Sequence, residues 1–178
     1  MSVLDHKIDF AAIISVTKAN PNGDPLNGNR PRQNYDGKGE MSDVCIKRKI
    51  RNRLQDMGDS IFVQSQDRTD DGFQSLRDRA DSNETLKKAL VDKKSKITSD
   101  EFASVACSEW TDVRSCGQVF AFKGSELSVG VRGPVSIQTA VSVDPVDVTS
   151  MQITKSVNST TSDTKGSDTM GMKHFVEF

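Results

Sequence analysis

The sequence has few of the residues that build metal centres, disulfide frameworks or membrane spans. Its 178 residues include 3 cysteines and 2 histidines, and aromatic residues make up 6%. The cysteines (Cys45, Cys107 and Cys116) are widely spaced and form no Cys-x-x-Cys pair, which argues against a zinc or disulfide framework and favours a reducing compartment. There is no apolar run of about 18 residues and no signal-peptide pattern at the N-terminus. We therefore expect a soluble cytoplasmic protein without a membrane partner.

The sequence also lacks the common catalytic motifs. It has no Gly-x-Ser-x-Gly elbow, no His-Glu-x-x-His pair and no Gly-x-x-x-x-Gly-Lys-Ser/Thr phosphate loop. Four acidic residues between positions 24 and 43 do not have the spacing of an EF-hand loop. We expect no catalytic residue, no metal and no cofactor. One alternative stays open, a metal-independent RNA-processing endonuclease in which His174 acts as general acid and base.

A net charge of −1 conceals an uneven distribution of charge along the chain. Residues 47–53 carry five cations, and residues 30–53 carry eight cations against three anions. Residues 46, 50, 54 and 57 are apolar at helical spacing and predict a helix with one buried stripe. Cations on both sides of such a stripe suit a phosphate backbone. A solvated helix face is the alternative.

A polar loop rich in proline and glycine precedes this basic helix. It covers residues 18–40 and follows residues 7–16, which are mostly apolar and predict a buried strand. Prolines and glycines bend such a backbone repeatedly. Its exposed amides suit phosphates or 2′-hydroxyls, and a purely structural Asx turn is the alternative.

The rest of the chain predicts helices first and strands later. The hydrophobic content of 34% is low and favours a modest core with polar arms. We expect Trp110, Phe120 and Phe122 in the core. Residues 113–122 fit either a strand or a short helix. After residue 147 the sequence predicts a long hairpin, with a tip of small residues at 158–166. The remaining expectations are helices at 72–79, 83–91 and 100–108 and one alternating strand at 128–143, with a bulge or an edge position at its Gly-Pro pair.

Several stretches, taken in order, resemble one protein family. They are residues 20–25 (NPNGDP), 42–52 (SDVCIKRKIRN), 112–122 (DVRSCGQVFAF), 131–136 (VRGPVS) and 153–158 (ITKSVN), continued at 166–174 (GSDTMGMKH). The combination is similar to the repeated backbone subunit of the CRISPR surveillance complex Cascade, the Cas-seven family, and specifically to its type I-C (Csd) branch. The resemblance covers nearly the whole chain.

The resemblance implies an α+β fold that is organised like a hand. Its palm is a modified RNA-recognition (ferredoxin-like) fold, its fingers are a helical insertion, and its thumb is a β-hairpin. Members of this branch are longer, so the resemblance implies that the chain is truncated at its C-terminus and lacks the second half of the palm. The implied division is residues 1–58 for the first part of the palm, 59–109 for the fingers, 110–143 for the second part of the palm, 144–172 for the thumb and 173–178 for the start of a returning palm strand.

The implied function is that of a non-catalytic subunit in an antiviral ribonucleoprotein. Such a subunit binds CRISPR guide RNA (crRNA) without sequence preference and oligomerises along it as a helical filament. The implied partners are the guide RNA, target DNA through the guide, neighbouring copies of the chain and other Cascade subunits. The sequence does not give the copy number, the guide sequence or the residues that contact neighbouring subunits.

The residues expected to contact RNA come from four places in the chain. The resemblance places the loop at residues 20–24 and the basic helix on the guide backbone. It places Met151 in the thumb as an apolar wedge, together with Lys155. Arg132 fits either a groove cation or an internal salt-bridge partner. The candidate RNA-binding residues are Asn20, Asn22, Arg30, Arg32, Lys47, Arg48, Lys49, Arg51, Arg132, Met151 and Lys155.

Overall fold

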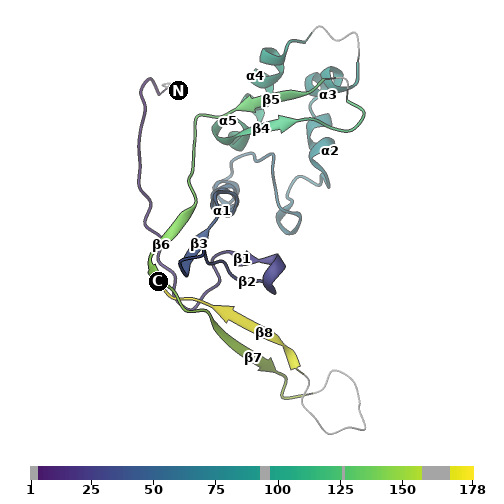
Figure 1. Ribbon diagram of the computed structural model, residues 1–178. Helices are drawn as coiled ribbons and strands as arrows, with labels where there is room; N and C mark the ends of the chain where they lie inside the picture. Colours follow the sequence, from purple (N-terminus) through teal and green to yellow (C-terminus); the bar gives the residue numbers. More distant parts are fainter. Residues whose placement is uncertain (1–3, 93–96, 126, 158–168) are drawn as a thin grey trace. The chain divides into compact units, whose positions relative to one another are not determined.

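The computed structural model in Figure 1 describes residues 4–92, 97–125, 127–157 and 169–178. The chain divides into two compact units, one formed by Asp43–Gln138 and the other by Met1–Ser42 together with Thr139–Phe178. Helices and two-stranded antiparallel sheets both occur in the described residues. The expected α+β class is therefore confirmed. The palm, fingers and thumb division stays a prediction, and so do the RNA-recognition form of the palm and its missing half.

The unit of residues 43–138 is mainly helical. Its helices and strands are α1 (Asp43–Asp56), the short η2 (Gln66–Arg68), α2 (Leu76–Asp81), α3 (Glu84–Val91), α4 (Ser99–Glu109), α5 (Thr111–Cys116), β4 (Gly117–Phe120) and β5 (Val129–Arg132). The basic helix and the three short helices after it are therefore confirmed. Residues 113–122 satisfy both alternatives in turn, because α5 ends at Cys116 and β4 begins at Gly117.

Aromatic side chains form the centre of this helical unit. Phe62 lies 4.6 Å from Trp110 and 4.9 Å from Phe120, measured between ring centroids. Phe102 meets Phe120 edge-on at 5.1 Å. All four are buried, and Phe122 packs against them partly buried. The prediction that Trp110, Phe120 and Phe122 belong to the core is confirmed, and tilted ring pairs at these distances stabilise a core beyond simple area burial.

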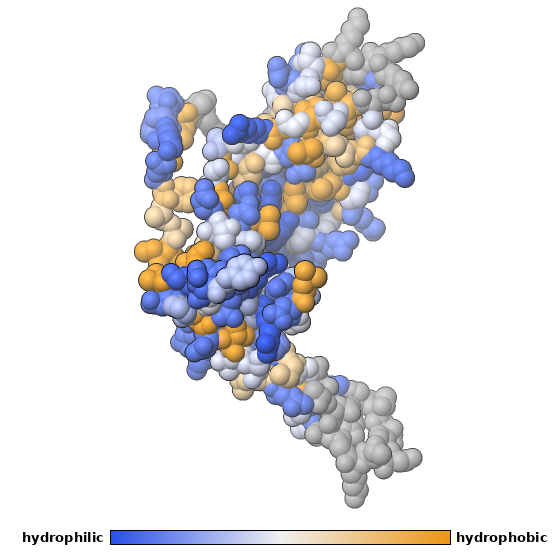
Figure 2. Space-filling view, viewed as in Figure 1, coloured by the Kyte–Doolittle hydropathy of each residue, from blue (hydrophilic) through white to orange (hydrophobic). Residues whose placement is uncertain are grey.

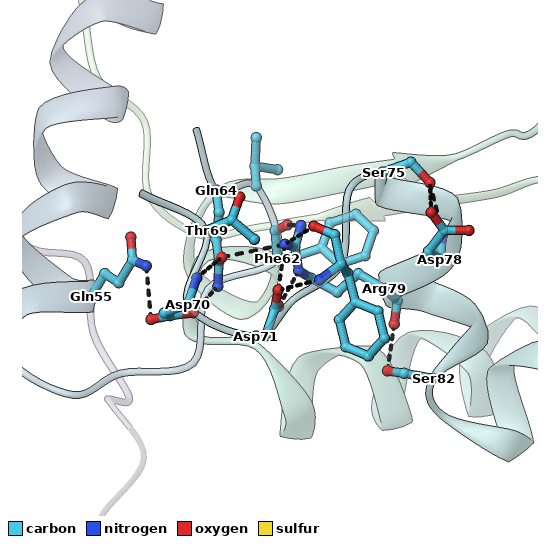
Figure 3. A network of polar contacts seen from close by, with 12 residues as sticks. Gln55, Phe62, Gln64, Thr69, Asp70, Asp71, Ser75, Asp78, Arg79 and Ser82 are labelled. Atoms are coloured by element: carbon cyan, nitrogen blue, oxygen red, sulfur yellow. Dashed lines mark hydrogen bonds and ion pairs between the residues drawn. The ribbon is translucent and has the colours of Figure 1, made fainter. Parts of the chain in front are cut away.

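A buried arginine ties the segment before α2 to the aromatic core. The Arg79 guanidinium donates to the Phe62 carbonyl at 2.8 Å and to Asp71 Oδ1 at 2.9 Å, as Figure 3 shows. The hydrogen bond from Arg79 lowers the pKa of the Asp71 carboxyl. Ser75 caps α2 by accepting from the Asp78 amide at 3.0 Å. The charged head of Arg79 is therefore satisfied inside the unit, as a buried charge requires.

The other unit is built from strands. They are β1 (Gly23–Asp24), β2 (Arg30–Pro31), β3 (Lys38–Met41), β6 (Ala140–Pro145), β7 (Thr149–Thr154) and β8 (Thr169–Phe175), with the short helix η1 (Pro25–Asn27) between β1 and β2. The pairs β1–β2, β3–β6 and β7–β8 are antiparallel. The long hairpin is confirmed as β7–β8, and its expected tip at 158–166 lies outside the described residues. A small cluster of Val16, Val146 and Val176 forms the core of this unit.

The predicted buried strand at residues 7–16 is wrong. These residues form no strand, and Ile13 is fully exposed at 100%. The segment, purple in Figure 1, is hydrophilic at its start and more hydrophobic farther along in Figure 2. Only its end has a backbone partner outside the segment, since Val16 exchanges backbone hydrogen bonds of 2.6 and 2.8 Å with Phe178, which lies beyond β8. An apolar composition favours a strand, but a strand also requires a neighbour for its backbone groups.

The single strand predicted at residues 128–143 is also wrong. The structure breaks it into β5 and β6, which belong to different units. Beyond β5 the Val135 amide donates to the Ser115 carbonyl at 2.9 Å, where α5 is ending. A Cβ on Gly133 would lie 2.2 Å from the same carbonyl oxygen. The Gly-Pro pair therefore ends a strand at a close backbone approach and does not mark a bulge within one.

Candidate nucleic-acid interface

Helix α1 is held within its unit by an ion pair with a buried aspartate. Arg51 Nε lies 2.9 Å from Asp112 Oδ2, with side-chain exposures of 13% and 1%. The Asp112 carboxylate also accepts from the amides of Phe62 at 2.7 Å and Val63 at 3.1 Å. Arg51 therefore has a structural task in the helical unit, joining α1 to α5 and to the chain at residues 62–63. Its predicted contact with RNA stays a prediction.

The neighbouring contacts of α1 are polar as well. Arg48 Nη1 donates to the Val63 carbonyl at 2.7 Å, and burial, followed by the nearby Arg51, lowers the pKa of the Arg48 guanidinium. Gln55 donates to the Arg68 carbonyl at 2.7 Å. The prediction of one buried apolar stripe is wrong, because no residue of α1 is buried and Ile50 is 39% exposed. The helix meets its own unit through the side that bears Arg48, Arg51 and Gln55.

The remaining cations of α1 are Lys47, one turn from Arg51, and Lys49 and Arg53 on another side of the helix. Lys47 pairs with Asp43 at 3.2 Å, one turn away. Lys49 and Arg53 are exposed, and within the described ranges neither side chain has a hydrogen bond or an ion pair. Four residues apart, they lie on the same face of the helix. This face, defined here by Lys49 and Arg53, is the part of the basic helix with charge to offer a ligand. Arg53 was missing from the predicted contacts, although its helical spacing from Lys49 identifies it.

The asparagines of the loop hold the loop itself together. Asn22 Oδ1 accepts from the amide of Ser42 at 2.9 Å and from its hydroxyl at 3.0 Å. Asn20 Nδ2 donates to the Asn29 carbonyl at 2.7 Å. Asp24 Oδ1 caps η1 by accepting from the Leu26 amide at 3.2 Å. Of these contacts, the one between Asp24 and Leu26 is a structural Asx turn, whereas those of Asn20 and Asn22 join residues farther apart in the chain. The predicted RNA contacts of Asn20 and Asn22 stay predictions.

The two arginines after the loop differ in their surroundings. Arg32 is half-buried, and its guanidinium lies 3.7 Å from the Asp24 carboxylate. Arg30 is exposed, and its Nη2 donates to Ser150 Oγ of β7 at 3.0 Å. The structure therefore brings Arg30 to the β7–β8 hairpin, in which Met151 was the predicted wedge. Nothing in the spacing of residues 30 and 150 could have shown this contact.

The β7–β8 hairpin exposes apolar and polar residues side by side. Met151 is exposed and pairs in register with Lys173, whose Nζ lies 5.7 Å from the centre of the Phe175 ring. Lys155 is half-buried just beyond β7. On the opposite side of the sheet, Ser150 pairs in register with His174. Met151 is exposed, and its role as a wedge stays a prediction.

Arg132 is the last residue of β5 and pairs in register with Gly117 of β4. It is exposed and lies at an open depression lined by Cys116, Val119 and Gly130, among others. The Arg132 side chain has no hydrogen bond or ion pair among the residues that the structure describes. Both the predicted contact with RNA and its salt-bridge alternative remain untested.

The candidate residues are thus shared between the two units. Those of α1 and β5 belong to the helical unit, and those of the loop, β2 and the β7–β8 hairpin belong to the strand unit. Within the strand unit, Arg30 and the hairpin lie together. No helix in the described part of the chain is long and apolar enough to cross a membrane.

The chain is similar in sequence to a known protein family and to a relative from an archaeon. The model of the family described as CRISPR-associated protein Cas7 matches residues 6–178. A CRISPR-associated protein Cas7 of Haloferax volcanii is 39% identical to the chain over 59 residues. That alignment covers 33% of this chain and 17% of the relative. The chain therefore aligns with only a small part of the length of this relative.

Proposed function

The chain belongs to the CRISPR-associated protein Cas7 family, and from this premise we propose that it binds CRISPR guide RNA as a backbone subunit of a Cascade-type complex in antiviral defence. The observation that carries the proposal is the family match over residues 6–178, nearly the whole chain. The exposed Lys49 and Arg53 on one face of α1 give it a physical basis, since cations on a helix face suit a phosphate backbone.

The finer parts of the proposal concern assembly and chemistry. Copies of the chain bind side by side along one guide RNA in a Cascade complex of type I-C. The guide then pairs with target DNA. The subunit makes phosphate contacts and reads no base sequence, as a holder of many different guides requires. Met151 of β7 is the proposed wedge between bases, because apolar side chains inserted between bases unstack them. The subunit itself carries out no catalysis.

The contacts within α1 determine which cations a binding experiment should change. Arg51 and Arg48 hold α1 to the rest of its unit, so replacing them would damage the fold and lower affinity for that reason alone. The side chains of Lys49 and Arg53 have no such contact among the described residues. Replacing these two residues therefore tests RNA binding without disturbing the fold.

The test is the salt dependence of RNA binding by the 178-residue chain. For single strands, log Kobs falls with log salt by about 0.7 for each phosphate that a cation neutralises. The double variant Lys49→Ala/Arg53→Ala should therefore lose about 1.4 from the magnitude of this slope. Lys87→Ala, an exposed cation of α3, should leave the slope unchanged. Equal slopes for the double variant and the wild type would show that this face does not contact the guide.

A further inference from the structure

Three polar side chains from three strands meet where β2 adjoins the β7–β8 hairpin. Arg30 Nη2 donates to Ser150 Oγ at 3.0 Å, and Ser150 Oγ lies 2.8 Å from His174 Nδ1. Ser150 and His174 are directly opposite each other in the antiparallel register. Arg30, Ser150 and His174 form a continuous chain of hydrogen bonds, which we name the Arg-Ser-His cluster.

The cluster has positive charge, and none of its side-chain contacts in the described part of the chain is with a carboxylate. Arg30 and Ser150 are exposed and His174 is half-buried. The other charged residues of β1, β2, β7 and β8 are Lys173, next to His174, and Asp24, which lies 3.7 Å from Arg32. Within the described ranges, Arg30 has no ion pair. A guanidinium carries five N–H donors, so the bond to Ser150 leaves Arg30 with donors for another acceptor.

The hydroxyl of Ser150 allows the cluster to adopt two hydrogen-bonding states. When His174 is neutral with its proton on Nε2, the Ser150 hydroxyl accepts from Arg30 and donates to His174 Nδ1. When His174 is protonated, Nδ1–H donates to Ser150 Oγ, and the hydroxyl proton is free to turn toward a ligand. The protonated state therefore adds one positive charge and one outward donor to the guanidinium donors of Arg30.

Such a set of donors fits one chemical group best. A phosphodiester offers anionic oxygens that accept from a guanidinium fork and from a hydroxyl together. A carboxylate of a protein partner has similar charge, but the proposed binding of guide RNA favours the phosphate. We propose that the Arg-Ser-His cluster binds a phosphodiester of the guide RNA. This inference rests on the proposed function and extends its interface from Arg30 to Ser150 and His174.

The Arg-Ser-His cluster lies next to the proposed wedge in β7. Ser150 is the immediate neighbour of Met151, and adjacent side chains of a strand point to opposite faces of the sheet. A phosphate held at Ser150 would fix the RNA backbone within one residue of the wedge. The cluster and Met151 would therefore contact the RNA from opposite faces of the same hairpin, at neighbouring positions of β7.

The test measures RNA affinity of the full chain at about pH 5.5 and about pH 8, because a histidine ordinarily changes charge between these values. The wild type should bind a single-stranded RNA about three- to tenfold more tightly at the lower pH, because protonation adds a charged donor. His174→Gln should remove most of this difference. His6→Gln, which changes the other histidine of the chain, should retain it. Arg30→Gln should weaken binding at both pH values.

Nuclear magnetic resonance of the ring protons adds a direct readout. With 2 histidines in the chain, the signal lost in His6→Gln identifies the other as His174. Adding RNA should move the midpoint of the His174 titration to higher pH, because a nearby anion favours the charged imidazole. A midpoint that does not move would overturn the inference, even if the variants weakened the hairpin.

The outcomes separate this inference from the proposed function. RNA binding by the wild type with an unchanged pH profile in His174→Gln would overturn the Arg-Ser-His cluster alone. No RNA binding by the wild type at either pH would overturn the proposed function as well. Cleavage of the RNA by the wild type but not by His174→Gln would also contradict the inference, since His174 would then act as an acid–base catalyst.

Discussion

Replacing Asp112 should destabilise the helical unit more than any surface substitution. Asp112 is 1% exposed and balances Arg51, which is 13% exposed. In Asp112→Ala the Arg51 guanidinium loses its counterion, and removing one partner of a buried pair costs about 3–5 kcal/mol. The amides of Phe62 and Val63 lose their acceptor at the same time, at about 1–3 kcal/mol for each buried donor. These costs overlap, so we expect a loss of about 4 kcal/mol in the free energy of unfolding.

The assay is urea unfolding followed by tryptophan fluorescence. The chain has 1 tryptophan, Trp110, which is buried beside Phe62 in the core of this unit. With a slope of about 2 kcal/mol per molar urea, a loss of about 4 kcal/mol lowers the midpoint by about 2 M. Asp36→Ala, which removes an exposed aspartate from the other unit, is the matched control and should leave the midpoint unchanged.

A double-mutant cycle separates the ion pair from the backbone contacts of Asp112. Arg51→Ala and Asp112→Ala should not be additive, because each single variant already breaks the same pair. The double variant should be less destabilised than the sum of the two. If Asp112→Ala moves the midpoint no more than Asp36→Ala does, or if the effects simply add, the proposed attachment of α1 is refuted.

Two further predictions concern packing and pH. Gly133→Ala should lower the urea midpoint, because its Cβ would lie 2.2 Å from the Ser115 carbonyl oxygen, whereas Gly130→Ala has open space and should be the milder change. The hydrogen bond from Arg79 holds the pKa of Asp71 below its ordinary value of 3.8. The stabilisation is therefore complete above about pH 4 and is lost as the pH falls through the lowered pKa. The melting temperature of Asp71→Asn should consequently fall less steeply than that of the wild type below pH 4, and parallel profiles would contradict this.

Elements defined by neighbouring residues were predictable from the sequence. The start of α3 follows from Asn83, which caps the helix by accepting from the amides of Thr85 and Leu86. The start of α4 follows from a capping box formed by Thr98 and Glu101. Both signals lie within three residues of the helix that they begin, and they precede apolar residues at helical spacing.

Features that depend on distant residues were not predictable. The apolar character of residues 7–16 predicted a strand, but composition does not reveal whether a neighbouring strand is present. The density of cations in α1 predicted an RNA-binding helix, yet the partner of Arg51 is Asp112, 61 residues farther along the chain. The hydrogen bond between Arg30 and Ser150 spans 120 residues. Tertiary contacts of this kind decide which cations serve the fold and which remain for a ligand.

The central claim is that the chain holds CRISPR guide RNA. The most direct measurement is sequencing of the nucleic acid that co-purifies with the chain from cells that carry its CRISPR repeats and partner subunits. The account predicts RNA of uniform length in which spacer sequence is joined to repeat sequence. Random cellular RNA, or no nucleic acid at all, would contradict it.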